Sequence, residues 1–369
     1  MNLNFKKALD SLIGGGTLFF IKPIVRFLGL ILKRDHSLIP QGDIAVIKML
    51  GGGSLVIALG ALLAIKKNYP HRKLILITTP PIAPFAKTLN VFDEILILND
   101  SGLLTLVKSS LTVLFKVFKI DTVIDYEVHS KLTTLFSLFT CARNRIGFYR
   151  ESVSERKYII THPVFFNLFY GSWYFYEKIS EKIGCVIPNE NEIAQHFKES
   201  NGFVREEKNY ICLGHGCSDL GLERMLSAQN WLVALKRENI EPGVELHFLG
   251  GPKEKIWADL IIKEVSDSFP NNRFINLSGE LKLNQSVEHL FHAKRFIGID
   301  SSLLHYSRLM GLPTKAFFGP TAPISLLKTF SYLTEEILYK QVPCSPCIHA
   351  SEKPPCNGDN KCIQNLFLS

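Results

Sequence analysis

The residues best placed to do chemistry follow an apolar run at 296–299 and begin with Asp300. Asp300 can accept hydrogen bonds from hydroxyl groups, and Ser301 and Ser302 can cap a helix that starts beside it. His305 adds a polar side chain one turn into that helix. The free N–H groups and the positive dipole end of a helix N-terminus favour a phosphate. This stretch therefore predicts a site for a ligand that carries phosphate and hydroxyl groups.

The elements around these residues predict a strand, a polar turn, a short helix and a second strand. Apolar positions continue the helix to residue 310, and Gly311 stands where a helix stop is expected. Residues 315–318 then have strand character. Open α/β sheets bind ligands at the carboxyl ends of parallel strands, which is where this arrangement places the turn.

The same stretch resembles the donor-site signature of glycosyltransferase family 9, which contains the heptosyltransferases of lipopolysaccharide core assembly. The matching residues are Asp300-Ser301-Ser302-Leu303-Leu304-His305, Gly311-Leu312-Pro313-Thr314 and Phe318-Gly319-Pro320-Thr321-Ala322-Pro323. The family form has Gly and Pro where this chain has Ser302 and Leu303, so the backbone path of the loop can differ. An ordinary βαβ turn in another nucleotide-binding sheet is the alternative interpretation.

The resemblance implies an α/β protein with the GT-B fold, in which two Rossmann-like, doubly wound domains face a cleft. It implies an inverting glycosyltransferase that moves a heptose or another hexose from a nucleotide diphosphate donor, ADP-heptose or similar. The acceptor would be a lipopolysaccharide core or a related lipid-linked saccharide, and no cofactor is required. Two alternatives stay open: a catalytically impaired family member that binds nucleotide sugar as a scaffold, and a GT-B transferase with another donor.

Strand-like and helical segments alternate along 44–148 and again along 209–318, which by itself predicts parallel, doubly wound sheets. The 369 residues are enough for two domains. We expect a basic, apolar N-terminal segment over 1–40, an acceptor domain over 41–195 and a donor domain with a Cys-rich tail over 205–369.

A glycine-rich loop with Gly52, Gly53 and Ser54 follows the first expected strand and opens a helix. It lacks the dinucleotide fingerprint and the P-loop lysine. In the family, the corresponding acceptor-side loop carries an Asp that acts as general base, and Ser54 occupies that position here. A serine hydroxyl cannot act as a base unaided, because a neighbour must take its own proton.

Glu127 is the expected replacement for the missing base. It lies with Asp125 and His129 just past a strand-like run, where a carboxylate could approach an acceptor hydroxyl. A solvated surface carboxylate is the alternative interpretation of Glu127.

Three further positions are expected to contact the donor. The family has a Lys before an aromatic residue, and the matching spacing gives Arg224, whose guanidinium could neutralise a departing diphosphate. Gly216 ends a strand and could offer its amide to the diphosphate. Glu254 lies in a segment that resembles the family's Gly-Gly-Pro-x-Glu and could hold ribose hydroxyls. The alternative interpretation of Arg224 is a surface arginine. That of Glu254 is a glutamate in the first turn of a helix, where it interacts with the helix dipole.

The net charge of +8 fits an anionic partner such as a phosphate-bearing substrate or an acidic lipid surface. The basic residues are dispersed and no nucleic-acid motif occurs, so we expect no nucleic-acid partner.

The N-terminal residues 17–32 are strongly apolar, but Lys22, Pro23 and Arg26 interrupt them. The run is too short for a convincing spanning helix, and no signal-peptide cleavage site follows. We expect either a segment that lies on an anionic bilayer or a helix packed on the protein's own surface. The first case predicts a cytoplasmic enzyme, peripheral on the inner face of the bacterial inner membrane.

Half of the eight cysteines lie in the tail, in a pattern similar to the end of many family 9 members: Cys344, Cys347, Cys356 and Cys362. A Cys-x2-Cys pair with two further cysteines could bind a structural zinc tetrahedrally. Reduced thiols or a disulfide are the alternatives, and the transfer reaction needs no metal.

Overall fold

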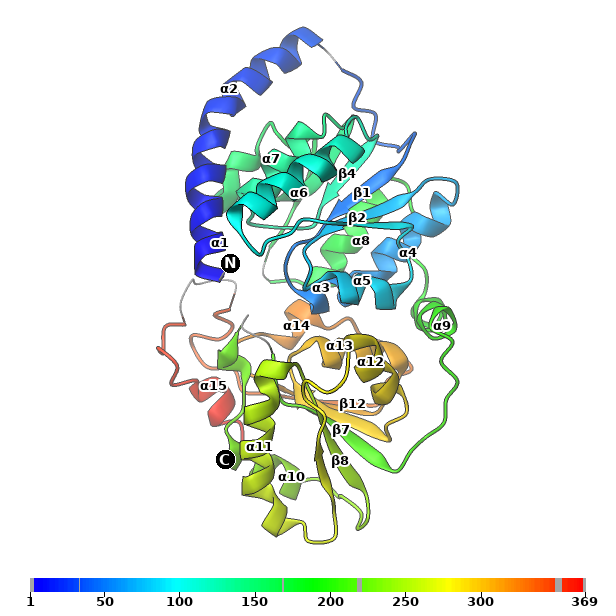
Figure 1. The fold of residues 1–369 in the computed structure, drawn as a ribbon, viewed down its shortest axis with the longest axis vertical. Coiled ribbons are helices and arrows are strands. Elements are labelled where there is room, and N and C mark those ends of the chain that lie inside the picture. Colours follow the sequence, from blue (N-terminus) through cyan, green and yellow to red (C-terminus); the bar gives the residue numbers. More distant parts are fainter. Residues whose placement is uncertain (1–2, 33, 168, 218–220, 349–353, 368–369) are drawn as a thin grey trace. The chain divides into compact units, whose positions relative to one another are not determined.

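The structure is a computed structural model. It describes residues 3–32, 34–167, 169–217, 221–348 and 354–367. The chain divides into two compact units, Met1–Pro188 and Asn189–Ser369, and each unit contains one six-stranded parallel sheet (Figure 1).

The first unit has the strand order β3-β2-β1-β4-β5-β6. Its strands are β1 (Ile44–Ile47), β2 (Leu74–Thr78), β3 (Glu94–Ile97), β4 (Thr122–Asp125), β5 (Asn144–Tyr149) and β6 (His162–Phe165). Its helices are α1 (Leu3–Leu9), η1 (Asp10–Gly14), α2 (Gly15–Leu32), α3 (Gly52–Ile57), α4 (Leu59–Asn68), α5 (Ala83–Leu89), α6 (Leu103–Lys116), α7 (Lys131–Phe139), η2 (Glu151–Arg156) and α8 (Ser172–Lys182).

The second unit has the strand order β12-β11-β10-β7-β8-β9. Its strands are β7 (Tyr210–Gly214), β8 (Glu245–Leu249), β9 (Phe274–Asn276), β10 (Arg295–Ile299), β11 (Thr314–Phe318) and β12 (Glu335–Tyr339). Its helices are α9 (Glu190–Ser200), η4 (Leu222–Arg224), α10 (Ala228–Lys236), η5 (Pro252–Glu254), α11 (Lys255–Val265), η6 (Ser266–Ser268), α12 (Leu283–Phe291), α13 (Ser302–Met310), α14 (Pro323–Leu326) and α15 (Lys361–Gln364).

Both sheets are doubly wound, as the alternating pattern predicted. The central strands are almost wholly apolar, for example Leu74–Ile77 of β2, because helices cover both faces of the sheet and every residue of that strand is buried. Strand order reverses between β1 and β4 in the first unit and between β7 and β10 in the second, and both pairs are parallel. Ligands bind outside the carboxyl ends of the strands at such reversal points. We therefore expect ligand sites at the turns that follow β1, β4, β7 and β10.

The boundary between the units differs from the expected one. The sequence placed it between 195 and 205, but the first unit ends at Pro188 and α9 belongs wholly to the second. The reason is packing: the rings of Phe197 in α9 and Tyr306 in α13 lie 5.8 Å apart. Glu190 Oε1 also accepts a hydrogen bond from the Ser331 amide at 2.9 Å.

The N-terminal residues form part of the first unit rather than a separate segment. Asp10 in η1 accepts hydrogen bonds from the amides of Lys131 (3.0 Å) and Leu132 (2.9 Å), so it caps α7. The elements α1, η1 and α2 form one N-terminal helix that is longer than the apolar run at 17–32. Its segment Asn4–Leu32 spans 29 residues and is long and apolar enough to cross a membrane. Pro23 lies inside α2 without ending it.

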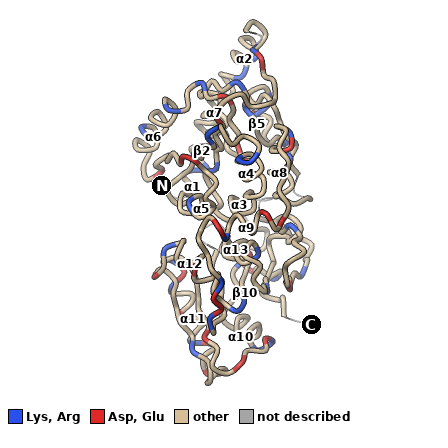
Figure 2. Tube along the Cα trace, turned by 90° about the vertical axis from the view of Figure 1, so that its right-hand side faces the viewer, with Lys and Arg blue, Asp and Glu red and all other residues tan. Residues whose placement is uncertain are grey.

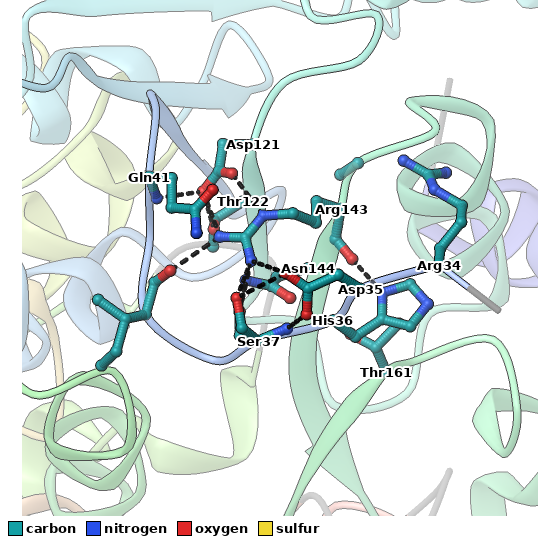
Figure 3. Close-up of polar contacts among 12 residues, drawn as sticks. Arg34, Asp35, His36, Ser37, Gln41, Asp121, Thr122, Arg143, Asn144 and Thr161 are labelled. Atoms are coloured by element: carbon teal, nitrogen blue, oxygen red, sulfur yellow. Dashed lines mark hydrogen bonds and ion pairs between the residues drawn. The ribbon is translucent and has the colours of Figure 1, made fainter.

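Lys and Arg are dispersed over each unit (Figure 2). A polar network at the amino-terminal edge of the first sheet fixes the segment between α2 and β1 (Figure 3). Arg143 is its centre: Nε donates to Asp121 Oδ1 at 2.8 Å, and Nη2 donates to the Ile39 carbonyl at 2.8 Å. The Gln41 amide donates to Asp121 Oδ2 at 2.9 Å. This network lies at the edge opposite the carboxyl ends of the strands, so we interpret it as structural.

Candidate active site

In the second unit, the turn after β10 leads into a helix as predicted, but among the described residues no serine side chain makes a capping hydrogen bond there. Ser301 is the N-cap of α13, and Gly311 ends that helix with a φ of 78°. A left-handed backbone conformation at this position favours glycine, and it ends the helix. The turn therefore presents the N-terminus of α13 at the carboxyl edge of the sheet.

Asp300 is only 2% exposed, and its carboxylate is engaged within the protein. Its Oδ2 accepts hydrogen bonds from Thr321 Oγ1 at 2.8 Å and from Arg224 Nη1 at 3.3 Å. His305 Nε2 lies 3.9 Å from Oδ1. Arg224 Nη1 also donates to the Asp300 carbonyl at 2.8 Å.

Asp300 and Arg224 thus form a pair that joins the turn after β7 to the turn after β10. The sequence assigned them separate partners, sugar hydroxyls for Asp300 and the diphosphate for Arg224. They meet because β7 and β10 are neighbouring strands, and because two buried opposite charges need each other as partners. Neither side chain is a solvated surface group.

Three buried polar atoms lie near this edge without a hydrogen-bond partner among the described residues. They are His215 Nδ1 after β7, Ser278 Oγ after β9 and Ser301 Oγ after β10. Nearly all buried polar groups in proteins are hydrogen-bonded. Other unpartnered atoms occur elsewhere, but these three follow strands of one sheet, so we interpret them as candidate contacts for polar atoms of a ligand.

His215 shows which kind of ligand atom fits there. Its Nε2 lies 3.0 Å from the Glu254 carbonyl, so Nε2 carries the proton and Nδ1 is the acceptor. Burial lowers the pKa of His215, so the ring is neutral near pH 7. Nδ1 can accordingly accept a hydrogen bond from a hydroxyl or amino group of a ligand.

Gly216 and Glu254 are also brought together, as two of the predicted donor contacts. A Cβ at Gly216 would lie 2.3 Å from the Glu254 carboxyl carbon, so only glycine permits this approach. Glu254 Oε2 accepts a hydrogen bond from the Gly251 amide at 2.5 Å. The carboxylate therefore lies directly against the backbone that follows β7.

His305 is buried in α13. Burial lowers its pKa to about 4, although the Asp300 carboxylate opposes the shift. His305 is therefore a neutral imidazole at pH 7.

Acid should destabilise the protein through His305. The unfolded chain takes up this proton below about pH 6.5 and the folded chain only near pH 4, so the free energy of unfolding should fall between these values by about 3 kcal/mol. Urea unfolding at several pH values would measure this, and His305→Gln should flatten the slope. Replacing the exposed His71 by Gln is the control. Equal slopes for wild type and His305→Gln would contradict the assignment.

In the first unit, the loop after β1 depends on its glycines. Gly51 has a φ of 77°, and a Cβ at Gly52 would lie 2.4 Å from the Phe85 ring. Ser54 hydrogen-bonds the buried Tyr176 hydroxyl. Tyrosine is a poor proton acceptor, so this contact does not turn Ser54 into a base.

The Glu127 side chain is only 13% exposed and is hydrogen-bonded within the protein, so the alternative of a solvated surface group is wrong. Its Oε1 accepts hydrogen bonds from Lys48 Nζ (3.0 Å), the Met49 amide (2.7 Å) and the Leu50 amide (3.1 Å). Burial alone would raise the pKa of Glu127, but the Lys48 charge and the two amides hold it below the usual value. The carboxylate is therefore ionised at neutral pH, and it fixes the start of the Gly51–Ser54 loop.

The two other polar residues after β4 have different surroundings. Asp125 is buried against Arg156 and accepts a hydrogen bond from Thr133 Oγ1 at 2.9 Å, so it is a structural ion pair. His129 keeps a solvent-exposed surface, but the part of its ring that is covered by the protein, together with the charges of Arg150 and Arg156, lowers its pKa. His129 is thus a second group at this edge that could accept a proton.

The four tail cysteines lie near one another. Cys347 and Cys362 are buried, and burial together with the other three thiols raises the pKa of Cys362 to about 11. Within the described ranges, no three His, Cys, Asp or Glu side chains are placed to hold a metal ion. A structural zinc at these cysteines stays a prediction.

Sequence reasoning found Asp300, Ser301, His305, Gly216 and Glu254 but did not single out His215, Ser278 or Thr321. His215 directly precedes Gly216, and Thr321 stands inside the Phe318–Pro323 motif, so the sequence carried a signal for both. Ser278 follows a three-residue strand, and nothing in the sequence around it indicated a role.

Comparison with known proteins identifies the family. The model of "Glycosyltransferase family 9 (heptosyltransferase)" matches residues 90–356. Lipooligosaccharide heptosyltransferase 2 of Haemophilus ducreyi is 31% identical over 87 residues, which are 23% of this chain and 24% of that relative. The chain thus aligns with about a quarter of this curated relative.

Solved structures show the fold. A family 9 glycosyltransferase from Veillonella parvula has a TM-score of 0.62 and 17% identity, over 81% of this chain and 86% of that one. ADP-heptose lipopolysaccharide heptosyltransferase II of E. coli has a TM-score of 0.61 and 16% identity, over 81% and 91%. The predicted GT-B fold with two doubly wound units is therefore confirmed. Because the family match spans most of the sequence, this chain belongs to glycosyltransferase family 9 and is a glycosyltransferase.

Proposed function

We propose that this enzyme transfers a heptose or a related hexose from a nucleoside diphosphate to a saccharide on a lipid anchor, with inversion at the anomeric carbon. The observation that carries the proposal is the set of unpartnered buried atoms, His215 Nδ1, Ser278 Oγ and Ser301 Oγ, at the carboxyl edge of the second sheet. A similar solved structure is E. coli heptosyltransferase WaaC with ADP-2-deoxy-2-fluoro heptose.

In this proposal the donor occupies the second unit. The diphosphate lies at the N-terminus of α13, where the amides of Ser301 and Ser302 face it and neutral His305 adds a polar group. Glu254, beside Gly216, holds ribose hydroxyls. The Arg224–Asp300 pair supports both turns, and the guanidinium stabilises negative charge on the departing diphosphate.

The transfer is a single displacement. The acceptor hydroxyl oxygen forms a bond to the anomeric carbon, while the bond from that carbon to the diphosphate oxygen breaks and its electron pair stays on the diphosphate. Glu127 takes the hydroxyl proton. No cofactor takes part in the step, and the enzyme works at the inner face of the bacterial inner membrane, where a lipid-linked acceptor would be found.

A donor-binding protein without transferase activity is the second candidate, because Ser54 stands where the family has its base. A panel of nucleotide sugars, including ADP-heptose and UDP-N-acetylglucosamine, tests both. The proposal predicts acceptor-dependent release of one nucleoside diphosphate and an inverted linkage by NMR. Donor binding without transfer to any lipooligosaccharide acceptor would favour the second candidate, and transfer from another sugar class would correct the donor.

Ser301→Ala should weaken donor binding roughly fivefold, which corresponds to one hydrogen bond of about 1 kcal/mol. It should leave the free energy of unfolding unchanged, because Ser301 Oγ has no partner among the described residues. Ser307→Ala is the matched control in the same helix: Ser307 Oγ donates to the Leu304 carbonyl at 2.8 Å, so its loss should destabilise the fold without a direct effect on the donor. Calorimetry measures the donor affinity of the two variants, and urea unfolding measures their stability. An unchanged donor affinity for Ser301→Ala would contradict a donor site at Ser301.

A further inference from the structure

Helix α6 of the first unit has two apolar faces. Its inner face, with Val113 and Val117, packs into the core cluster that also contains Phe136 of α7. Its outer face carries four large apolar side chains that are between 50 and 85% exposed: Leu104, Val107, Leu111 and Phe115. Their spacings of three and four residues place them on one side of the helix. Folding of the unit explains the inner face and leaves the outer one without a role.

The charged residues of the stretch that forms this outer face are all lysines, although Lys116 Nζ lies 3.5 Å from Glu94 Oε1 of β3. Lys108, Lys116 and Lys119 lie in the same stretch, and residues 101–120 contain no Asp or Glu. Accordingly, α6 carries basic but no acidic segments in Figure 2. An apolar stripe beside lysines is typical of a helix that lies in the interface of an anionic membrane.

The N-terminal helix also exposes large apolar side chains, whereas its Lys22 donates to the Ser154 carbonyl of the same unit. Phe20, Ile24, Phe27 and Ile31 of α2 are exposed, opposite Leu18, which is buried with Leu135 and Ile159. Residues 11–34 contain four Lys and Arg and no acidic residue.

The two helices are anchored to one unit and begin near each other. Lys6 in α1 pairs with Asp100, three residues before α6 begins. To span a bilayer, the N-terminal helix would have to give up its packing on α7 and uncover Leu135 and Ile159. Its present position is that of a helix lying along the surface of the unit.

We propose that the outer faces of α6 and α2 together dock the first unit onto an anionic lipid bilayer, with both helices lying in the interface rather than crossing it. The proposal adds α6 as a lipid-contacting element and deepens the proposed function, since it rests on a membrane-bound acceptor. Docking through this unit would hold the proposed acceptor side at the bilayer that carries the lipid-linked saccharide.

Sedimentation of the full-length protein with lipid vesicles tests this. We expect binding to phosphatidylcholine vesicles that contain phosphatidylglycerol, weaker binding without phosphatidylglycerol, and further weakening by salt. The triple variant Leu104→Ser/Leu111→Ser/Phe115→Ser should bind more than tenfold more weakly with an unchanged melting temperature. The matched control, Val186→Ser/Val204→Ser/Ile256→Ser, removes equally exposed apolar residues elsewhere and should bind like wild type.

Wild-type binding by the α6 variant, or no vesicle binding by the wild type, would overturn the proposal. So would analytical ultracentrifugation that shows a wild-type dimer and a monomeric α6 variant, with vesicle binding unchanged, because a second copy would then cover the face. Transfer to a deacylated, soluble acceptor separates this from the proposed function. With this soluble acceptor, the α6 variant should transfer at the wild-type rate. If neither protein transfers sugar but the wild type still binds vesicles, the proposed reaction is refuted and the docking is not.

Discussion

Asp300→Ala is expected to lower the free energy of unfolding by about 3–5 kcal/mol and to abolish donor binding. The substitution leaves the Arg224 guanidinium buried without its carboxylate, which is the costly way to break a buried ion pair. It also removes the acceptor of the Thr321 hydroxyl. Urea unfolding and calorimetric titration with the donor nucleotide measure the two effects.

A double variant separates the two roles of Asp300. Arg224→Met/Asp300→Ala removes both charges, so it should recover most of the lost stability without recovering donor binding. Thr321→Val removes only one hydrogen bond and should cost about 1 kcal/mol. If the double variant is no more stable than Asp300→Ala, the pair is not the source of the destabilisation.

Glu127→Gln should lower the transfer rate by about 10²–10⁴-fold, the range for loss of a general base. Donor affinity should stay unchanged, because the donor is assigned to the other unit. Gln keeps a carbonyl oxygen for the Met49 and Leu50 amides but leaves the Lys48 charge unpaired, so the folded state of the variant must be checked by unfolding. Single-turnover kinetics measure the rate.

The pH profile shows which group takes the proton. The pKa of Glu127 is held below 4.5, so with Glu127 as base the wild-type rate should not decline between pH 8 and 5 for lack of ionised carboxylate. With His129 as base, the rate would fall as pH drops through the imidazole pKa, which is below 6.5, and His129→Gln would lose activity. Full activity of Glu127→Gln with an inactive His129→Gln would reassign the base.

Much of the fold could be predicted because its signals are local. Residues Leu74–Ile77 of β2 are an uninterrupted apolar run, and Gly311 ends α13 where a left-handed backbone conformation is needed. Such features depend on neighbours in sequence, so the doubly wound units and the turn at Asp300 could be inferred without coordinates.

Contacts between residues far apart in the chain could not be predicted from the sequence. Arg224 and Asp300 are 76 residues apart, and neither gives a sign in the sequence that the other is its partner. The position of α9 depends on Phe197 meeting Tyr306. The length of the N-terminal helix depends on Asp10 capping α7, which keeps residues before the apolar run in place.

The central claim is that a nucleoside diphosphate binds at the carboxyl edge of the second sheet, against Gly216. Calorimetric titration of ADP, UDP and GDP into wild type, Gly216→Ala and Gly251→Ala tests it most directly. A methyl at Gly216 would displace the Glu254 carboxylate, whereas a methyl at Gly251 would meet it only at an ordinary 3.7 Å. We predict one bound nucleotide per wild-type chain, strong loss for Gly216→Ala and little change for Gly251→Ala. No heat with any nucleoside diphosphate, or equal affinity for Gly216→Ala and wild type, would contradict the account.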